Sequence, residues 1–422
     1  MRQTILSVMS LLLGTALVYL GNGVLGTLLG VRMAQIDFGA IVAGIVMAAY
    51  FAGVVAGTFY GRSLIAGVGH IRAFSAFASC FSAAVLAHPF LVDPTAWGVL
   101  RFVEGVCLSG LSMCTESWLN ARAGNEYRGR VLSIYMIVLY GAQGGGQFLL
   151  FLPDPSGFGL FVAASILTSI ALVPVAISKV DAPPLPDASR VGMREMYRAS
   201  PTSVVAAFVS GLTLGAVYGL LPFVTLRLGM DETGTAQVMG ALIVGGVLLQ
   251  WPLGRLSDHM DRRKVLLAVT AVIGITSAAL ALAAGAGGPW MLILVPFFGG
   301  VLFTLYPLAL AYAGDHVAPE KLVQANGTMI LTYGVGAAIG PVAASGLMQA
   351  VGPRGLFMFD AAVAAAAVVF TLWRIGQRPS MPTEEQSPFQ PVPRTSPVAA
   401  EMDPRAETDE PELDLARPRT GG

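Results

Sequence analysis

The chain has 422 residues, of which 55% are hydrophobic and only 12% are charged, and its formal net charge is zero. Ordinary soluble domains carry about 25% charged residues, and nucleic-acid-binding proteins carry a basic patch or stripe. The composition therefore indicates a membrane protein and gives no reason to expect a nucleic-acid partner.

Apolar segments that are long enough to cross a bilayer follow one another from residue 4 to residue 374. About 20 helical residues cross a hydrocarbon core about 30 Å thick. The twelve segments are 5–31, 39–61, 72–92, 95–118, 130–152, 158–177, 202–226, 234–254, 265–285, 289–312, 323–347 and 354–374. The runs are continuous rather than alternating, which favours helices over a transmembrane β-barrel. We expect the first segment to be an uncleaved helix, because it is too long for a signal peptide.

Basic residues sort between the two sides of the predicted bundle. Seventeen Lys and Arg residues fall in loops on the side that carries the N-terminus, against three, Arg32, Arg227 and Arg354, on the other side. Cytoplasmic loops carry such an excess of positive charge. Both termini are therefore expected to be cytoplasmic, in a multi-pass membrane protein.

The twelve segments divide six and six around a polar, Pro-rich and basic stretch at residues 178–200. The loop that begins at Gly61 returns as the loop at Gly254, and the Tyr-Gly pair at Tyr140 returns at Tyr333. Internal repeats of this kind are typical of transporters whose substrate site lies between the repeats.

These boundaries predict four parts of the chain. An N-terminal half spans 1–177, a cytoplasmic linker 178–200 and a C-terminal half 201–375. Residues 376–422 are rich in Pro, Glu, Asp, Arg and Thr, and such a composition buries too little apolar surface to fold. We expect a disordered, solvated cytoplasmic tail, with a regulatory or binding role as the alternative.

The loop from Gly254 to Lys264 is the most specific motif in the sequence. It resembles the signature loop of the major facilitator superfamily, G-x-L-a-D-r-x-G-r-r-k, which lies between the second and third helices of each half. Matching positions are Gly254, Leu256, Asp258, Arg262 and Arg263, whereas Asp261 replaces the second glycine and the first-half copy lacks the aspartate.

The resemblance extends over residues 4–374. It implies an all-α membrane protein of 12 transmembrane helices in two pseudo-symmetric six-helix halves, the fold of the major facilitator superfamily. The strings GHIRAF at Gly69, ESWLN at Glu116 and RGR–LSIYMIV at Arg128 look most like the uncharacterised bacterial YcaD-type branch.

The chemistry of the Gly254 loop predicts a cytoplasmic latch. Gly254 would let a neighbouring helix approach, and Asp258 could face the positive end of another helix. Arg262 and Arg263 could bind a carboxylate at a helix end, for which Asp315 is a candidate. Glu116 lies beside Arg122, Arg128 and Arg130 in the sequence, and an inter-helix salt bridge is expected there. The alternative is a basic loop that only sets topology.

Arg101 and Glu104 are expected to couple transport to protons. They lie one turn apart in segment 4, in a run that resembles the superfamily's fourth-helix motif R-x-x-q-G-x-g. Charged groups inside a membrane usually face a cavity and a partner. Glu104 would be the protonatable group and Arg101 its tuning partner, and the alternative is a structural pair.

Polar side chains on several other segments are candidates for a substrate cavity. Gln143 and Gln147 share one face of segment 5, where they could bind a substrate, each other or a neighbouring helix. The remaining candidates are Tyr19, Asn22, Tyr50, Tyr218, Tyr306 and Tyr333.

Together these features predict a secondary active transporter that moves a small solute by alternating access and is coupled to protons. The chain lacks a Walker pattern, so uphill transport would draw on an ion gradient. The expected partners are a small-molecule substrate, protons and the lipid bilayer, and the expected state is a monomer. No cofactor, metal site or enzymatic activity is expected; His88 and Asp93 have an acyltransferase-like spacing but lie in a short outside loop. An uncoupled facilitator, or a non-transporting scaffold or sensor, is the alternative.

Overall fold

A computed structural model of the chain describes residues 2–122, 127–152, 157–177, 191–286, 290–318, 321–377 and 381–403. Within these ranges all regular elements are helices, and twelve of them are long and apolar enough to span a membrane. The twelve predicted segments are confirmed as spans. They are α1 (Arg2–Gln35), α2 (Ala40–Val68), α3 (His70–Ala87), α4 (Pro94–Arg122), α5 (Arg128–Gly145, continued by the 3-10 helix η2, Gly146–Phe151), α6 (Gly159–Ala176), α8 (Pro201–Arg227), α9 (Glu232–Asp258), α10 (Arg262–Ala286), α11 (Trp290–Gly314), α12 (Leu322–Val351) and α13 (Gly355–Ile375).

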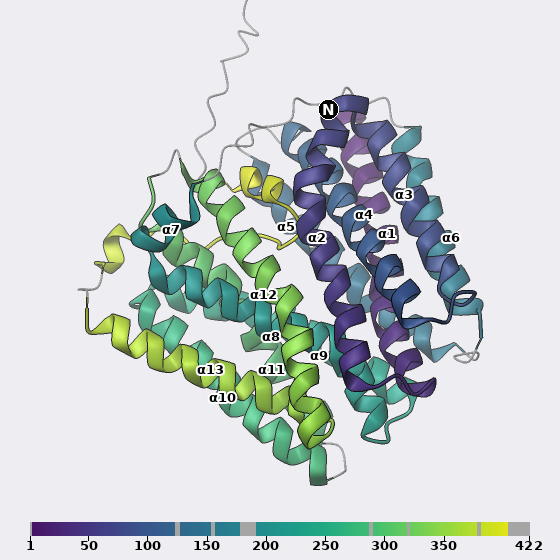
Figure 1. Cartoon of the computed structure of the whole chain (residues 1–422). Coiled ribbons are helices and arrows are strands. Elements are labelled where there is room, and N and C mark those ends of the chain that lie inside the picture. The colour runs from purple at the N-terminus through teal and green to yellow at the C-terminus, as the bar shows by residue number, and fades with distance from the viewer. Residues whose placement is uncertain are drawn as a thin grey trace, which may run out of the picture.

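Helices α1 to α6 gather on one side of the molecule and α8 to α13 on the other (Figure 1). We call the end of the bundle at which α1 begins the basic face, because the predicted basic loops, such as those at Arg122 and Lys264, lie there. The end that carries Gln35 and Arg227 is the opposite face. The short helix α7 (Met193–Ala199) lies at the basic face before α8; the rest of the expected linker, 178–190, lies outside the described residues.

The outer surface of the bundle is apolar. Leu248, Leu282 and Val369 are each about two-thirds exposed or more, at 66%, 79% and 68%. A soluble protein would not leave many such side chains in water. Inside a bilayer they contact lipid, and the helices satisfy their own backbone groups.

Small residues set the closest helix contacts. A Cβ atom on Gly53 of α2 would overlap the carbonyl of Phe102 in α4, and one on Gly211 of α8 would overlap the carbonyl of Tyr333 in α12. Glycine at these positions lets the backbones approach closely, as in other membrane helix pairs.

Segment 5 is not the single α-helix that was expected over 130–152. The α-helical part ends at Gly145, and the chain continues as η2. Three consecutive glycines, 144–146, weaken the α-helix here. Gly146 also lies so close to Leu20 of α1 that a side chain would overlap its carbonyl oxygen, and the tighter turn accommodates this contact.

The two groups of helices meet at the opposite face. A Cβ atom on Gly30 of α1 would lie 2.8 Å from Pro222 of α8, and one on Gly44 of α2 would overlap Pro341 and Ser345 of α12. Arg227 of α8 forms a 2.5 Å ion pair with Asp37, and Gln35 donates a 2.5 Å hydrogen bond to Glu232. The opposite face is therefore closed by contacts between the groups.

The C-terminal tail differs from the expectation of disorder over 376–422. Residues 381–403 follow the basic face and enter the space between the two groups of helices, as the yellow segment in Figure 1 shows. Val392, Ala399 and Met402 are buried, and 397–402 form a 3-10 turn, η5. The composition argument fails here because these few apolar residues pack against helices and not against one another. Residues 404–422 lie outside the described residues.

Candidate functional site

A central cavity of about 160 Å³ lies between the two groups of helices. Of the eight residues expected in a cavity, seven line it: Tyr19, Asn22, Tyr50, Gln143, Gln147, Tyr218 and Tyr333. Tyr306 is the exception. It is fully buried, donates a hydrogen bond of 3.2 Å to Asn326, and packs edge-on behind the Tyr333 ring.

The two glutamines of segment 5 differ in their surroundings. Gln147 donates to the Gly23 carbonyl at 2.9 Å and accepts from Thr27 at 2.8 Å, so α1 satisfies its amide. Gln143 lines the cavity, and its side-chain amide makes no hydrogen bond to another described residue. Gln147 thus binds a neighbouring helix, and Gln143 remains available to a solute.

Arg101 and Glu104 form the expected pair, and a histidine joins them. Arg101 Nη1 donates to Glu104 Oε2 at 2.8 Å, and the guanidinium stacks over the Tyr50 ring at 4.1 Å. His88 Nδ1 lies 3.4 Å from Glu104 Oε1, and its hydrogen bond goes to the Ala84 carbonyl. All three charged or titratable side chains are buried.

This triad lies about 10 Å into α4 from Pro94 at the opposite face, by the rise of an α-helix. Arg101 reaches the cavity, whereas Glu104 is not among the residues that line it. In the sequence, His88 stands out only for its acyltransferase-like spacing from Asp93. The Trp97 indole donates to the His88 backbone carbonyl at 3.1 Å, and the His88 ring packs against the rings of Trp97 and Phe161.

Glu104 is not the only carboxylate that is fully buried within a span. Glu116 in α4 and Asp360 in α13 are also fully buried. Neither Asp360 oxygen has a hydrogen-bond partner among the described residues. The sequence places both residues near the ends of predicted segments. Their burial depends on the neighbouring helices and the tail, which the sequence does not show.

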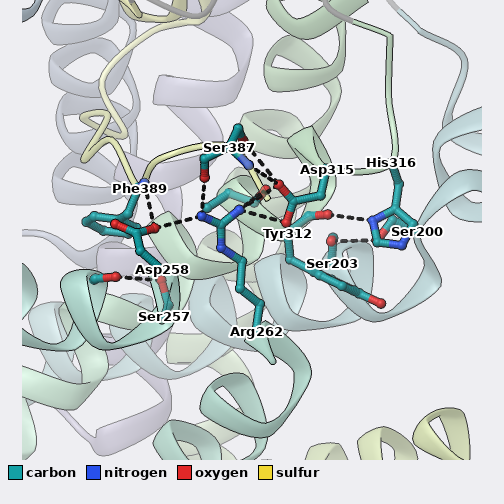
Figure 2. A network of polar contacts seen from close by, with 12 residues as sticks. Ser200, Ser203, Ser257, Asp258, Arg262, Tyr312, Asp315, His316, Ser387 and Phe389 are labelled. Carbon is teal, nitrogen blue, oxygen red and sulfur yellow. Dashed lines mark hydrogen bonds and ion pairs between the residues drawn. The ribbon is translucent and has the colours of Figure 1, made fainter. Parts of the chain in front are cut away.

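Arg262 forms the expected contact with Asp315 and organises a network at the basic face (Figure 2). Its Nη1 lies 2.6 Å from both Asp315 oxygens, and its Nη2 lies 2.8 Å from Asp258. The tail completes this network. Arg262 donates to the Ser387 carbonyl, and the Phe389 N–H donates to Asp258 at 2.8 Å.

The other predicted latch residues take different partners. Gly254 makes room for the ring of Phe389, not for a helix. Arg263 pairs with Asp261 at 2.9 Å. Glu116 is bonded to three hydroxyls, those of Tyr135 at 2.8 Å and of Thr395 and Ser396 in the tail, and none of the ion pairs seen among the described residues includes it. The network therefore joins α9, α10, α11 and the tail, and it does not bridge the two groups of helices directly.

The tail reaches both groups of helices. Its first part is bonded to Asp258 and Asp315 in the second group, and its last part to the first group, where Asn120 of α4 donates to Glu401 at 2.9 Å. Between these anchors Arg394 and Thr395 line the central cavity. Sequence reasoning missed these residues; the spaced apolar residues Phe389, Val392, Val398 and Met402 are the only signal that could have indicated packing.

Two helical groups around a central cavity that is closed at one face define the architecture of a membrane transporter. Comparison with known proteins agrees. A sequence profile described as Major Facilitator Superfamily matches residues 203–405. The proteins named "Uncharacterized MFS-type transporter YcaD" from Salmonella typhi and Salmonella typhimurium are 31% identical over 377 residues, which cover 88% of this chain and 97% of theirs.

The chain therefore belongs to the major facilitator superfamily, and it is a transporter of the YcaD type. Solved structures share the fold. The nucleoside transporter NupG has a TM-score of 0.69 at 12% identity, over 88% of this chain and 98% of that one. A D-xylose-proton symporter has a TM-score of 0.65 at 15% identity, over 87% and 96%. A bacterial homologue of the human lysosomal transporter Spinster, inward-facing and occupied, has 0.68 at 13%, over 90% and 97%.

Proposed function

We propose that the chain is a secondary active transporter that carries a small solute across the bacterial cytoplasmic membrane by alternating access. The basic face lies in the cytoplasm, so the described state is closed to the outside. The observation that carries the proposal is the central cavity, which direct helix contacts close at the opposite face and which Arg394 and Thr395 of the tail line.

Alternating access needs a seal that can open. The seal at the opposite face consists of two polar contacts between exposed partners, Arg227 with Asp37 and Gln35 with Glu232, and of close backbone approaches at Gly30 and Gly44. Exposed ion pairs contribute only about 0–1 kcal/mol each. Separating these contacts is therefore a small cost relative to unfolding a helix pair, and a rocking motion of the two halves can open this face.

Proton coupling is proposed to reside in the triad of Arg101, Glu104 and His88. Glu104 has a cation on one side and an imidazole on the other. Arg101 also lines the cavity. A solute that binds Arg101 would therefore weaken the ion pair between Arg101 and Glu104 and change the protonation of the Glu104 carboxyl. An uncoupled facilitator would have no use for this arrangement.

The proposal is tested by locking the seal. Gln35→Cys and Glu232→Cys are combined in a variant without Cys80, Cys107 and Cys114, and the protein is reconstituted into liposomes that contain a pH-sensitive dye. A panel of sugars, nucleosides, amines and drugs is screened for uptake. We expect at least one solute to be transported, a short bis-methanethiosulfonate crosslinker to stop its uptake, and a reductant to restore it. The two single-cysteine variants are the controls. Transport that continues in the crosslinked double variant, or no transport of any solute, would contradict alternating access at this seal.

A further inference from the structure

Arg394 of the tail occupies an aromatic cage inside the central cavity. Its guanidinium carbon lies 5.0 Å from the centre of the Phe303 ring and 5.5 Å from that of Tyr333, and its Nη2 donates to the Tyr140 hydroxyl at 3.4 Å. The Tyr218 ring packs on the Phe303 ring at 5.8 Å and also lines the cavity. The cage residues come from α5, α8, α11 and α12, so both halves contribute to it.

The cage holds a cation without a carboxylate. None of the ion pairs seen among the described residues includes Arg394, and its Nη1 has no hydrogen-bond partner there. An Arg side chain stays charged at any ordinary pH. Faces of aromatic rings attract such a cation through their quadrupole, and aromatic cages recognise organic cations in this way. The cage is therefore suited to a delocalised or alkylated cation rather than to a neutral solute.

A buried carboxyl group is covered by the same stretch of tail that places Arg394 in the cage. Thr395 and Ser396, the two residues that follow Arg394, bond both oxygens of the buried Glu116. When the tail leaves, Glu116 keeps only the Tyr135 hydroxyl among these partners. A buried carboxylate with too few donors favours a positively charged ligand. The vacated cavity would thus offer a cation both aromatic faces and a carboxylate.

We propose that the transport cavity binds organic cations of the guanidinium or amine type, and that Arg394 is a tethered competitor for that subsite. This rests on the proposed function, since it names the substrate class of the same cavity. A tethered group competes at a high effective concentration. A ligand that needs the vacated cage therefore has an apparent Kd equal to its intrinsic Kd divided by the fraction of molecules in which the tail has left the cavity. The tail then limits transport until a cation, or another partner of the tail, displaces it.

The experiment measures equilibrium binding to the full chain in nanodiscs by calorimetry. The probes are N-benzylguanidine and its neutral isostere N-benzylurea. Arg394→Gln removes the competitor, and Arg354→Gln, at an exposed site on the opposite face, is the matched control. We expect Arg394→Gln to bind N-benzylguanidine about 10-fold more tightly than the wild type or the control does, and to bind N-benzylurea at least about 10-fold more weakly than the cation. Phe303→Leu in the Arg394→Gln background should lose the preference for the cation.

Equal affinity for the cation and the urea would overturn the proposal. If Arg394→Gln binds neither probe, hydrogen exchange of residues 387–403 shows whether the tail has left. A second variant, Arg394→Gln with Thr395→Ala and Ser396→Ala, also removes the hold on Glu116, and failure of this variant to bind the cation means that the cage serves the tail alone. Because binding is measured without transport, a chain that carries neutral solutes but binds no cation refutes this inference and leaves the proposed function intact.

Discussion

Replacing Arg262 by Ala should destabilise the protein more than any other Arg-to-Ala change in its loop. The guanidinium is 1% exposed and lies 2.6 Å from both oxygens of Asp315, which is also 1% exposed. Removal of one member of a buried ion pair leaves an uncompensated charge and costs about 3–5 kcal/mol. The free energy of unfolding should fall by that amount, measured by tryptophan fluorescence during titration of mixed micelles with SDS.

The matched control is Arg255→Ala, because Arg255 is exposed and its guanidinium lies over the Trp251 ring, 5.4 Å from the ring centre. A cation–π contact at an exposed site contributes about 0.5–1 kcal/mol. The double variant Arg262→Ala/Asp315→Ala removes both buried charges, and its cost should be about 2–3 kcal/mol smaller than the sum of the single costs. A loss in Arg262→Ala no larger than that in Arg255→Ala, or strictly additive costs in the double variant, would refute the reasoning.

Three further predictions concern coupling, pH and topology. Glu104→Gln should abolish accumulation of the solute against a gradient in proteoliposomes but keep solute exchange at equal concentrations. Glu384→Gln, in the exposed part of the tail, should keep both activities. If Glu104→Gln still accumulates the solute, the Arg101–Glu104 pair is structural. In the docked tail, burial raises the pKa of Glu401 from 4.5 to about 7. The hydrogen bond from Asn120 and the positive charges of Arg128 and Arg62 lower this pKa, whereas the nearby Glu116 raises it. The docked tail therefore binds the proton more tightly than a free tail, so docking is strongest below about pH 4.5 and weakens as the pH rises through 7. The protection factors of the amides of residues 387–403, which compare their hydrogen exchange with the intrinsic rate at each pH, should fall over that range in the wild type and stay level in Glu401→Gln. In a variant without native cysteines, Asp93→Cys should react with an impermeant thiol reagent on whole cells and His259→Cys only after lysis, since both sites are exposed and lie on opposite faces; the reverse pattern would invert the proposed orientation.

Local sequence was sufficient for the features that depend on one helix or one loop. The twelve spans follow from hydropathy, because each helix satisfies its own backbone and needs only an apolar surface toward lipid. The Arg101–Glu104 pair follows from a spacing of three residues on a helix. The contact of Arg262 with Asp315 could be expected from position, because Asp315 follows segment 289–312 on the same side of the bundle as the Gly254 loop.

Features that depend on distant packing could not be read in this way. His88 follows α3 directly, and its ring meets Glu104 only in the packed structure, where it also contacts the rings of Trp97 and Phe161. The tail has a composition that does not fold alone, yet Glu116 and Asp258 each need hydrogen-bond donors that their own helices do not supply. A tail residue that donates a hydrogen bond to a buried carboxylate is held in place, because buried polar groups require hydrogen-bond partners. No pattern in the sequence of the tail shows that these carboxylates lack donors.

The asymmetry between the two signature loops has a physical reason in this structure. Only the second-half loop carries the aspartate, and only that loop holds the tail, since Asp258 accepts the Phe389 N–H and Gly254 accommodates the Phe389 ring. The first-half loop has Ala66 near the corresponding place and contributes no described bond to the tail. Arg262 binds Asp258, Asp315 and the Ser387 carbonyl with one guanidinium. A movement of α9 against α11 that stretched these bonds would therefore weaken the attachment of the tail. In the proposed mechanism, a rearrangement of the second group of helices thus releases Arg394 from its cage.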